Sequence, residues 1–336
     1  MQRMKILYLN NYAANKEFLK SVQFDEISLW HWYGFDKLID SEHLVFFEQF
    51  HVEKIWSKNR FIRIISTLFF QLKIFLKYRN VNFVYSSCGH IADIFAFMKA
   101  IHLFRGGLLL IQHHPVKIVF PNTYNCIICI SEFVSNYLRE KYPKAKIFYK
   151  YLGPYLPFYE RHKLSEVQYQ IISNGKSFRD FDILEKCCTE LKLKTLIIGI
   201  ERINTEYITY IPNVCAVDNS LLCSMSRTMA ITVNEKNNGI CGITSLNDAL
   251  AFEMPVLISD NARIGFNVEE LGLGLIYKCG NYDSLKEKMK LLITDDFIGS
   301  CKKNIRRFRE VNSYEKFSDF TSKLVNDYLN NKGWSK

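Results

Sequence analysis

The feature that most constrains the fold is a repeated alternation of short apolar runs with segments of helical periodicity. In the first half, six runs rich in β-branched and aromatic residues lie at 4–10, 43–48, 81–87, 108–114, 126–131 and 146–152. Parallel strands need a long crossover connection, which is usually a helix, so this alternation is typical of a parallel sheet covered by helices. The first half therefore predicts one α/β domain.

The alternation is interrupted once and then restarts. Residues 154–168 contain two prolines and end in a charged stretch, as expected of a linker. Further apolar runs follow at 169–173, 195–199, 229–233, 255–259 and 274–278. Two successive α/β units are the simplest interpretation.

The expected architecture is α/β, with two Rossmann-like, doubly wound parallel-sheet domains facing a central cleft. We assign residues 1–155 to an N-terminal domain, 156–168 to the linker, and 169–310 to a C-terminal domain. Residues 311–336 carry apolar residues at helical spacing, and we expect them to form a helix that packs back on the N-terminal domain.

The composition is that of an ordinary globular enzyme. The chain has 336 residues, of which 48% are hydrophobic and 23% charged, so extensive disorder is not expected. No run of about 18 uncharged apolar residues occurs, and the apolar run at the amino terminus is too short for a signal peptide. We therefore expect a cytoplasmic protein, with peripheral attachment to the inner face of the cell membrane as an open alternative.

The net charge of +10 favours anionic partners. The lysines and arginines are spread along the chain, and no nucleic-acid-binding module is recognisable. A phosphate-bearing substrate or an anionic lipid surface is therefore favoured over nucleic acid.

The ten cysteines lie mostly in apolar runs, which indicates reduced thiols rather than a disulfide framework. Cys126 and Cys129 have the spacing of a metal-binding pair, but residues three apart on a strand point to opposite faces. We predict no metal site.

The loop after 169–173 places two cations where a parallel sheet binds ligands. A turn at Asn174-Gly175 leads into a helix, so Lys176 and Arg179 lie near a helix amino terminus. Such a terminus carries about half a positive charge and free N–H groups, which suits a diphosphate. The alternative is that both are solvated cations, with Arg179 paired to Asp180 or Asp182.

The loop that follows 229–233 is the second candidate. Two glycines allow the backbone to approach a ligand closely, and a helix amino terminus follows. The ligand-binding candidates in this segment are Asn238, Gly239, Gly242, Thr244 and Ser245, and Asp248 falls in the first turn of that helix. For the carboxylate a structural alternative exists, because Ser245 and Asp248 have the spacing of a capping box.

Together these loops resemble the retaining family-4 glycosyltransferases and their relatives with the GT-B fold. Gly175, Lys176 and Arg179 occupy the positions of that family's diphosphate clamp, and DALAFEMPV at 248–256 is similar to the second half of its Glu-containing motif. The resemblance implies that the N-terminal domain lies on the acceptor side and that the C-terminal domain, with its loop candidates, binds the nucleotide sugar. It also implies that Asp248 binds the donor ribose. The family's first glutamate has no counterpart, since the matching position is Ile240. Its glycine is replaced by Glu253, which costs about 1 to 2 kcal/mol if a left-handed residue is still required there.

The resemblance also implies a histidine after the strand at 108–112, facing the donor sugar, and His113 or His114 takes that catalytic role. The expected activity is transfer of a hexose-type sugar from a nucleotide-diphosphate donor to a saccharide or lipid-linked saccharide in cell-surface polysaccharide synthesis. Retention and independence of metals and other cofactors are expected, with the nucleotide sugar as co-substrate. A GT-B sugar-nucleotide epimerase and a catalytically inactive GT-B binding protein remain as alternatives.

Residues 60–79 predict a helix with a membrane-binding alternative. Its apolar arc, which includes Ile65, Leu68, Leu72 and Leu76, is expected to face the domain core. The opposite, polar arc contains Gln71 and the cations, and two apolar residues fall among them, where they would contact lipid. The candidates for the membrane surface are Arg63, Phe70, Lys73, Ile74 and Lys77.

Overall fold

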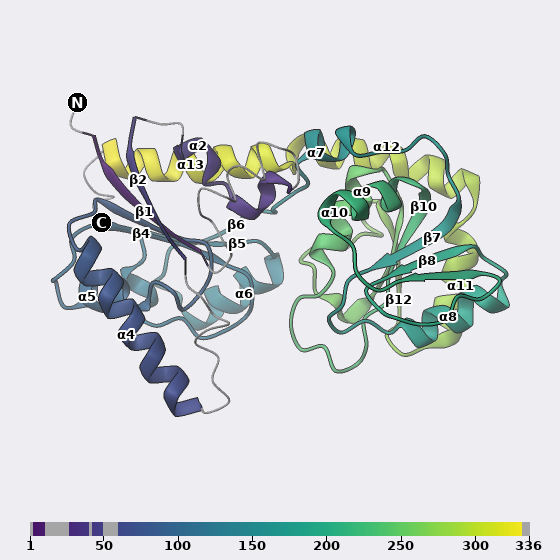
Figure 1. The fold of residues 1–336 in the computed structure, drawn as a ribbon, viewed down its shortest axis with the longest axis horizontal. Helices are drawn as coiled ribbons and strands as arrows, with labels where there is room; N and C mark the ends of the chain where they lie inside the picture. Colours follow the sequence, from purple (N-terminus) through teal and green to yellow (C-terminus); the bar gives the residue numbers. More distant parts are fainter. Residues whose placement is uncertain (1–2, 11–26, 40–41, 50–59, 331–336) are drawn as a thin grey trace. The chain divides into compact units, whose positions relative to one another are not determined.

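The structure, a computed structural model, describes residues 3–10, 27–39, 42–49 and 60–330, which divide into two units (Figure 1). Of these residues, unit 1 contains 3–10, 29–39, 42–49, 60–152 and 315–330. Unit 2 contains 27–28 and 153–314.

Unit 1 is built on a parallel sheet in the order β2-β1-β3-β4-β5-β6. Every residue of β3, β4 and β5 is buried, as expected for strands covered on both faces. The strands are β1 (Lys5–Asn10), β2 (Leu44–Gln49), β3 (Phe83–Ser86), β4 (Gly107–Gln112), β5 (Cys126–Cys129) and β6 (Ile147–Tyr149). The helices that follow the strands include α2 (Asp36–Ile39), α4 (Arg60–Tyr78), α5 (Asp93–Ala100) and α6 (Glu132–Lys141).

Unit 2 contains a second parallel sheet, in the order β12-β11-β10-β7-β8-β9. Helices α9 and α10 pack together on one face, and α8 and α11 pack together on the other (Figure 1). The strands are β7 (Tyr169–Asn174), β8 (Thr195–Ile198), β9 (Ile208–Ile211), β10 (Ser226–Ile231), β11 (Val256–Ser259) and β12 (Gly274–Tyr277). The helices are α7 (Leu156–Arg161), α8 (Phe181–Glu190), α9 (Ala216–Ser224), α10 (Ile243–Ala251), α11 (Tyr282–Leu292) and α12 (Asp295–Val311).

Each strand order reverses once, and ligands of open α/β sheets bind at that reversal, beyond the carboxyl ends of the strands. In unit 2 the chain passes from β7 to β8 and β9 and then returns to β10 on the other side of β7. In unit 1 the corresponding reversal lies between β1 and β3. The loops after β7, β10 and β3 are therefore the first places to look for a site.

The predicted fold class is confirmed, because both sheets are parallel and every predicted run contains or overlaps a strand. One strand was missed: β9 is an edge strand of four residues, too short for a clear pattern. Residues 156–161, predicted as part of the linker, form α7 within unit 2.

The last helix, α13 (Tyr314–Asn330), packs against unit 1 along most of its length. The Ser318 hydroxyl donates a hydrogen bond to the Asp36 carboxylate at 2.8 Å, and the Thr321 hydroxyl donates one to the carbonyl of Gly34 at 3.0 Å. Further along, the ring of Tyr328 contacts that of Phe83.

The predicted orientation of α4 is wrong. Ile74 is buried and Phe70 is partly buried, whereas the arc expected to face the core is exposed, with Leu68 at 55% and Leu76 at 60%. The reason is Gln71, a polar residue assigned to the solvent side, which is 2% exposed because its amide bonds two backbone groups. Lys73 and Lys77 are exposed as predicted, and the side chain of Arg63 lies outside the described residues.

None of the described helices is long and apolar enough to cross a bilayer.

The cysteines are free thiols, as predicted, and none of the ten takes part in a disulfide. Cys126 and Cys129 are both buried on β5, and burial raises the pKa of each thiol to about 12.

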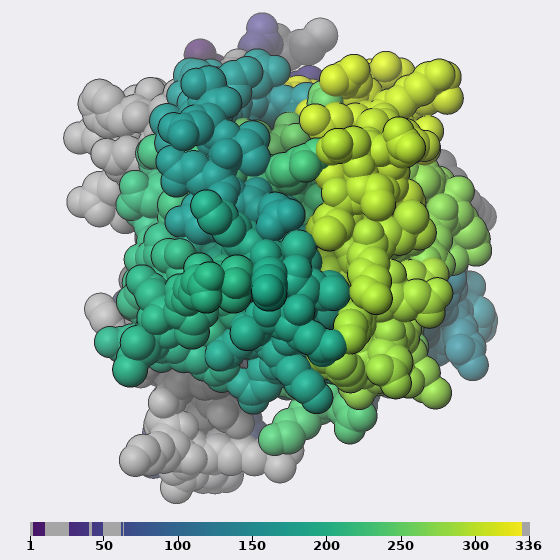
Figure 2. Space-filling view, turned by 90° about the vertical axis from the view of Figure 1, so that its right-hand side faces the viewer, coloured from purple at the N-terminus to yellow at the C-terminus, as the bar shows by residue number. Residues whose placement is uncertain are grey.

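Glu253 explains how the chain ends α10 without the family's glycine. Its φ of +57° confirms that a left-handed residue is still required at this helix end. The carboxylate compensates for the strain by binding Arg306 and Arg309 of α12, each at 2.7 Å. Arg309 also donates to the carbonyls of Leu250 and Ala251, so α12 is fixed to the end of α10. In Figure 2, α12 (yellow-green) lies beside the teal and green segments of unit 2.

Candidate functional site

Gly175 follows β7 at the switch point of unit 2 and meets two requirements there. Its φ is +109°, a conformation that side-chain-bearing residues rarely adopt. A Cβ at this position would also lie 2.6 Å from Nη2 of Arg179. The glycine therefore allows the guanidinium to pack directly against the backbone at the end of the strand.

Arg179 is held by three protein groups from the two candidate loops. Its Nε donates to the carbonyl of Asn174 at 3.0 Å, Nη1 to the sulfur of Cys241 at 2.8 Å, and Nη2 to the hydroxyl of Ser245 at 2.8 Å. An arginine has five N–H donors, so two remain available for a ligand.

No described carboxylate neutralises Arg179, which rules out the alternative that it pairs with a neighbouring aspartate. Asp182 binds Arg202 at 2.6 Å, and Asp180 caps α8 by accepting from the N–H of Ile183 at 3.2 Å. Burial lowers the pKa of Arg179, because few waters solvate its charge. A partly buried cation without a counter-ion is costly unless an anion completes the site.

The amino terminus of α10 lies beside Arg179 and is uncapped. Gly242 is the N-cap residue, with a φ of +96°, and no side chain accepts a hydrogen bond from the first turn, which also lacks acidic residues. The predicted capping box is wrong, because Ser245 lies inside the helix and its hydroxyl bonds the Asn174 carbonyl. Asp180 already caps the amino terminus of α8, so the amino terminus of α10 is the better binding site for a phosphate group.

Lys176 lies in the same loop as Arg179 but bonds a different part of unit 2. Its side chain is exposed, and Nζ donates to the amide oxygen of Asn213 at 2.6 Å. Beneath it, Gly199 at the end of β8 has a φ of +115°, and a Cβ there would lie 2.7 Å from the carbonyl oxygen of Gly175. Gly199 and the thiol of Cys241, which accepts from Arg179, were not among the predicted site residues.

Asp248 is buried and accepts hydrogen bonds from three side chains. Tyr159 of α7 donates at 2.8 Å, Asn174 of β7 at 2.7 Å, and Asn219 of α9 at 3.0 Å. Burial outweighs these bonds and raises the pKa of the carboxyl. Asp248 therefore joins four elements of unit 2, whatever its part in binding a donor.

The remaining predicted donor residues lie at the rim of this loop. Thr244 and Asn238 are exposed, and the carbonyl of Asn238 accepts a hydrogen bond from Arg263. Gly239 is held by both ends of the Asn237 amide.

The nearest glutamate of this loop, Glu235, lies beside another glycine. A Cβ on Gly280 would lie 2.6 Å from Oε1 of Glu235.

His113 and His114 line a cavity of about 250 Å³ at the carboxyl ends of β3 and β4. Nε2 of His113 lies 2.8 Å from the carbonyl of Ser87, so this nitrogen carries a hydrogen. Burial lowers the pKa of His113 to about 4, so its ring is neutral at pH 7. His114 is exposed, and its carbonyl accepts from the Gln112 amide at 2.7 Å. The structure therefore places both predicted histidines in one pocket of unit 1.

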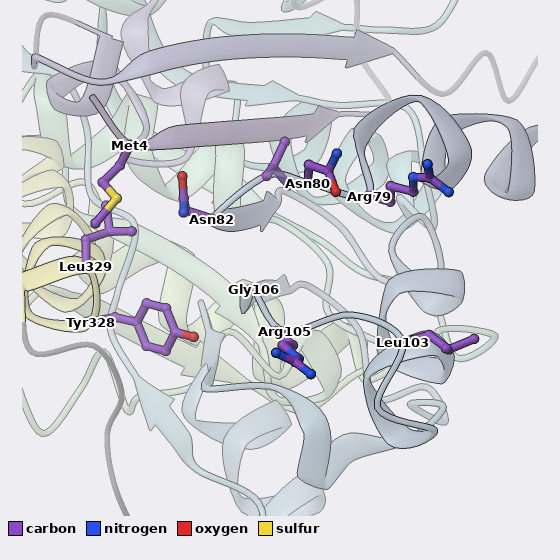
Figure 3. Close-up of a pocket in the computed structure, with 10 residues that line it drawn as sticks. Met4, Arg79, Asn80, Asn82, Leu103, Arg105, Gly106, Tyr328 and Leu329 are labelled. Atoms are coloured by element: carbon purple, nitrogen blue, oxygen red, sulfur yellow. The ribbon is translucent and has the colours of Figure 1, made fainter. Parts of the chain in front are cut away.

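A second cavity in unit 1 lies at the amino-terminal ends of the strands (Figure 3). It has a volume of about 470 Å³ and opens beside Met4, Asn82 and Gly106, which precede β1, β3 and β4. None of the predicted site residues lines it. Ligands of this fold class bind beyond the carboxyl ends of the strands, so we do not assign the candidate site to this cavity.

No group of three His, Cys, Asp or Glu side chains suited to a metal ion occurs in the described parts of the chain. Metal independence remains a prediction.

Comparison with known proteins relates the chain to others through its fold. No family model and no curated protein matches the sequence. Among solved structures, an α,α-trehalose 6-phosphate synthase from Burkholderia multivorans is similar with a TM-score of 0.73 and 9% identity, over 99% of this chain and 100% of that one.

Two further solved structures cover both chains to a similar extent. A sucrose-phosphate synthase from Thermosynechococcus elongatus has a TM-score of 0.71 at 10% identity, over 97% of this chain and 99% of that one. Anabaena HepE in complex with UDP has a TM-score of 0.65 at 12% identity, over 96% and 100%. The chain therefore has the GT-B fold, with two Rossmann-like domains, which it shares with these solved structures.

Proposed function

We propose that this chain is a glycosyltransferase that takes a hexose-type sugar from a nucleotide-diphosphate donor. The observation that carries the proposal is Arg179, a partly buried cation without a carboxylate partner, beside the uncapped start of α10. The fold supports it, because solved structures that share this fold include glycosyltransferases and HepE bound to UDP. UDP is therefore the first nucleotide to test.

In the proposed reaction, an oxygen of the acceptor forms a bond to the anomeric carbon of the donor sugar. The bond from that carbon to the diphosphate oxygen breaks, its electron pair leaves with the nucleoside diphosphate, and an oxygen of that diphosphate takes up the proton of the acceptor hydroxyl. Arg179 and the α10 amino terminus stabilise the charge that develops on the leaving group, and Lys176, exposed in the same loop, adds a second cation. Retention of anomeric configuration, and a saccharide or lipid-linked acceptor in cell-surface polysaccharide synthesis, are further parts of the proposal.

We expect release of nucleoside diphosphate from a UDP-, GDP- or ADP-sugar to depend on an acceptor and to persist in EDTA. The cations of the protein would serve the leaving group in place of a bound metal ion. The measurement is coupled detection of the released diphosphate, with a CMP-sugar as the monophosphate control.

The same assay separates the alternatives. An epimerase converts the donor sugar without acceptor, and a binding protein binds the nucleotide without turnover. Complete loss of activity in EDTA, restored by magnesium or manganese, would exclude metal-independent stabilisation.

We also propose that unit 1 rests on an anionic bilayer through the exposed side of α4, rather than through Phe70 and Ile74. Seven large apolar side chains are between 39% and 71% exposed and form what we call the α4 apolar face: Ile62, Ile64, Ile65, Leu68, Phe69, Leu72 and Leu76. The helix has no acidic residue in its sequence, and Lys73 and Lys77 are exposed. Apolar side chains among cations suit the interface of a negatively charged leaflet.

We expect the protein to float with vesicles of phosphatidylglycerol and phosphatidylcholine, and the double change Leu68→Ser and Phe69→Ser to abolish flotation. The two side chains supply much of the apolar contact with lipid. Ile203→Ser is the matched control, since Ile203 is 90% exposed in unit 2. The bilayer proposal fails if the wild type does not float, or if the control change releases the protein equally.

A further inference from the structure

His90 lies at the switch point of unit 1, in the loop between β3 and α5. It lines the same cavity of about 250 Å³ as His113 and His114, although the sequence motifs did not identify it. Ligands of open parallel sheets bind at this position in the topology.

The backbone at His90 is strained and firmly held. Its φ is +69°, a left-handed conformation that residues with a side chain rarely adopt. The buried amide of Gln71 donates to the His90 carbonyl at 2.5 Å and accepts from the N–H of Ile94 at 2.9 Å. Strain that the surrounding structure maintains is typical of functional sites.

The side chain of His90 is oriented by Asp93. Nδ1 lies 3.1 Å from the carboxylate of Asp93, which can only accept, so Nδ1 carries the hydrogen. The imidazole is 51% exposed, and within the described residues Nε2 forms no hydrogen bond. The ring therefore presents one nitrogen for a ligand, in a fixed orientation.

The same cavity contains a buried oxygen that lacks a donor. Gln112 is 1% exposed, and its Oε1 has no hydrogen-bond partner among the described residues, although its amide nitrogen bonds His114. Gly89 keeps the approach open, since a Cβ there would lie 2.8 Å from this oxygen. Buried carbonyl oxygens are rarely left unpaired, and a hydroxyl of a ligand is a suitable donor.

We propose that His90, held by Asp93 and Gln71, binds a hydroxyl of the acceptor sugar through Nε2, while Gln112 accepts from a second hydroxyl. The inference rests on the proposed function. A cavity of this size, smaller than that for a drug-sized ligand, suits a single sugar ring. The diphosphate site lies in the other unit, and His113 or His114 of this pocket is the histidine expected to face the donor sugar, so a second sugar bound beside them is the acceptor. His90 is then a residue that determines acceptor specificity.

The test is His90→Gly, with methyl glucoside, galactoside, mannoside and N-acetylglucosaminide as probes. Binding is measured by titration of the histidine-ring NMR signals of the whole protein. We expect affinity for the preferred hexoside to fall at least tenfold, while UDP affinity and the melting temperature do not fall. A purely structural role would instead leave hexoside binding unchanged, because glycine relieves the strain.

His102→Gly is the matched control. His102 is an exposed histidine of unit 1 with a φ of +61°, so the change relieves similar strain outside the pocket. The inference is overturned if the wild type binds none of the hexosides, or if both glycine variants bind equally well. Failure of the proposed function appears separately, as absence of nucleotide binding and donor turnover in the wild type.

Discussion

Replacement of Arg179 by alanine is expected to lower kcat/KM for the nucleotide-sugar donor by about 100-fold. This factor corresponds to about 2.7 kcal/mol, within the range for charge-assisted hydrogen bonds to a phosphate. Two N–H donors of Arg179 remain free after it has bonded Asn174, Cys241 and Ser245, and they adjoin the open start of α10. Donor turnover and UDP binding are the measurements.

Arg202→Ala is the control for Arg179. Arg202 is a partly buried arginine of the same unit whose charge is already paired, at 2.6 Å with Asp182 and 2.5 Å with Glu185. Its removal should leave donor turnover unchanged. An unaltered rate in Arg179→Ala would remove that residue from the site, and a large fall in melting temperature would assign it to the fold instead.

The sequence was sufficient for the fold because long-range order in a parallel sheet is expressed locally. The central strands β3, β4 and β5 are fully buried apolar runs and most connections contain a helix, so the pattern and the topology largely coincide. β9 was not predicted, because an edge strand of four residues with half of its positions partly exposed gives almost no periodic signal. The end of α10 was also predictable from local sequence. A left-handed residue is required there, and Glu253 adopts that conformation where the resembling family has a glycine.

The site was harder to predict because its groups are selected by contacts between distant segments. The partner of Arg179 could not be identified from charge, as the sequence offered two aspartates and the structure uses Asn174, Cys241 and Ser245. The orientation of α4 was predicted wrongly for a related reason. Gln71 was expected to face solvent, because the two backbone groups that its amide bonds cannot be identified from the sequence. His90 has no motif at all, and only the sheet order and its φ distinguish it.

Asp248→Ala is expected to lower the melting temperature of the protein by about 6 to 12 °C. The change removes the buried acceptor that Tyr159, Asn174 and Asn219 share, at a cost of about 3 kcal/mol. For a domain of about 160 residues, each kcal/mol corresponds to about 2 to 4 °C. Differential scanning calorimetry measures the shift.

Two further variants separate this structural role from the ribose contact that the family resemblance implies. Tyr159→Phe removes a single donor to Oδ1 and should cost about a third as much stability, with UDP affinity unchanged. Asp248→Asn keeps the volume but turns an N–H₂ group toward donors, so it should destabilise nearly as much as alanine. If Asp248→Asn instead melts like the wild type and loses UDP affinity, the carboxylate is a ribose ligand first. The three protein donors leave one acceptor position on Asp248, so both roles are compatible only if the ribose hydroxyl takes that position.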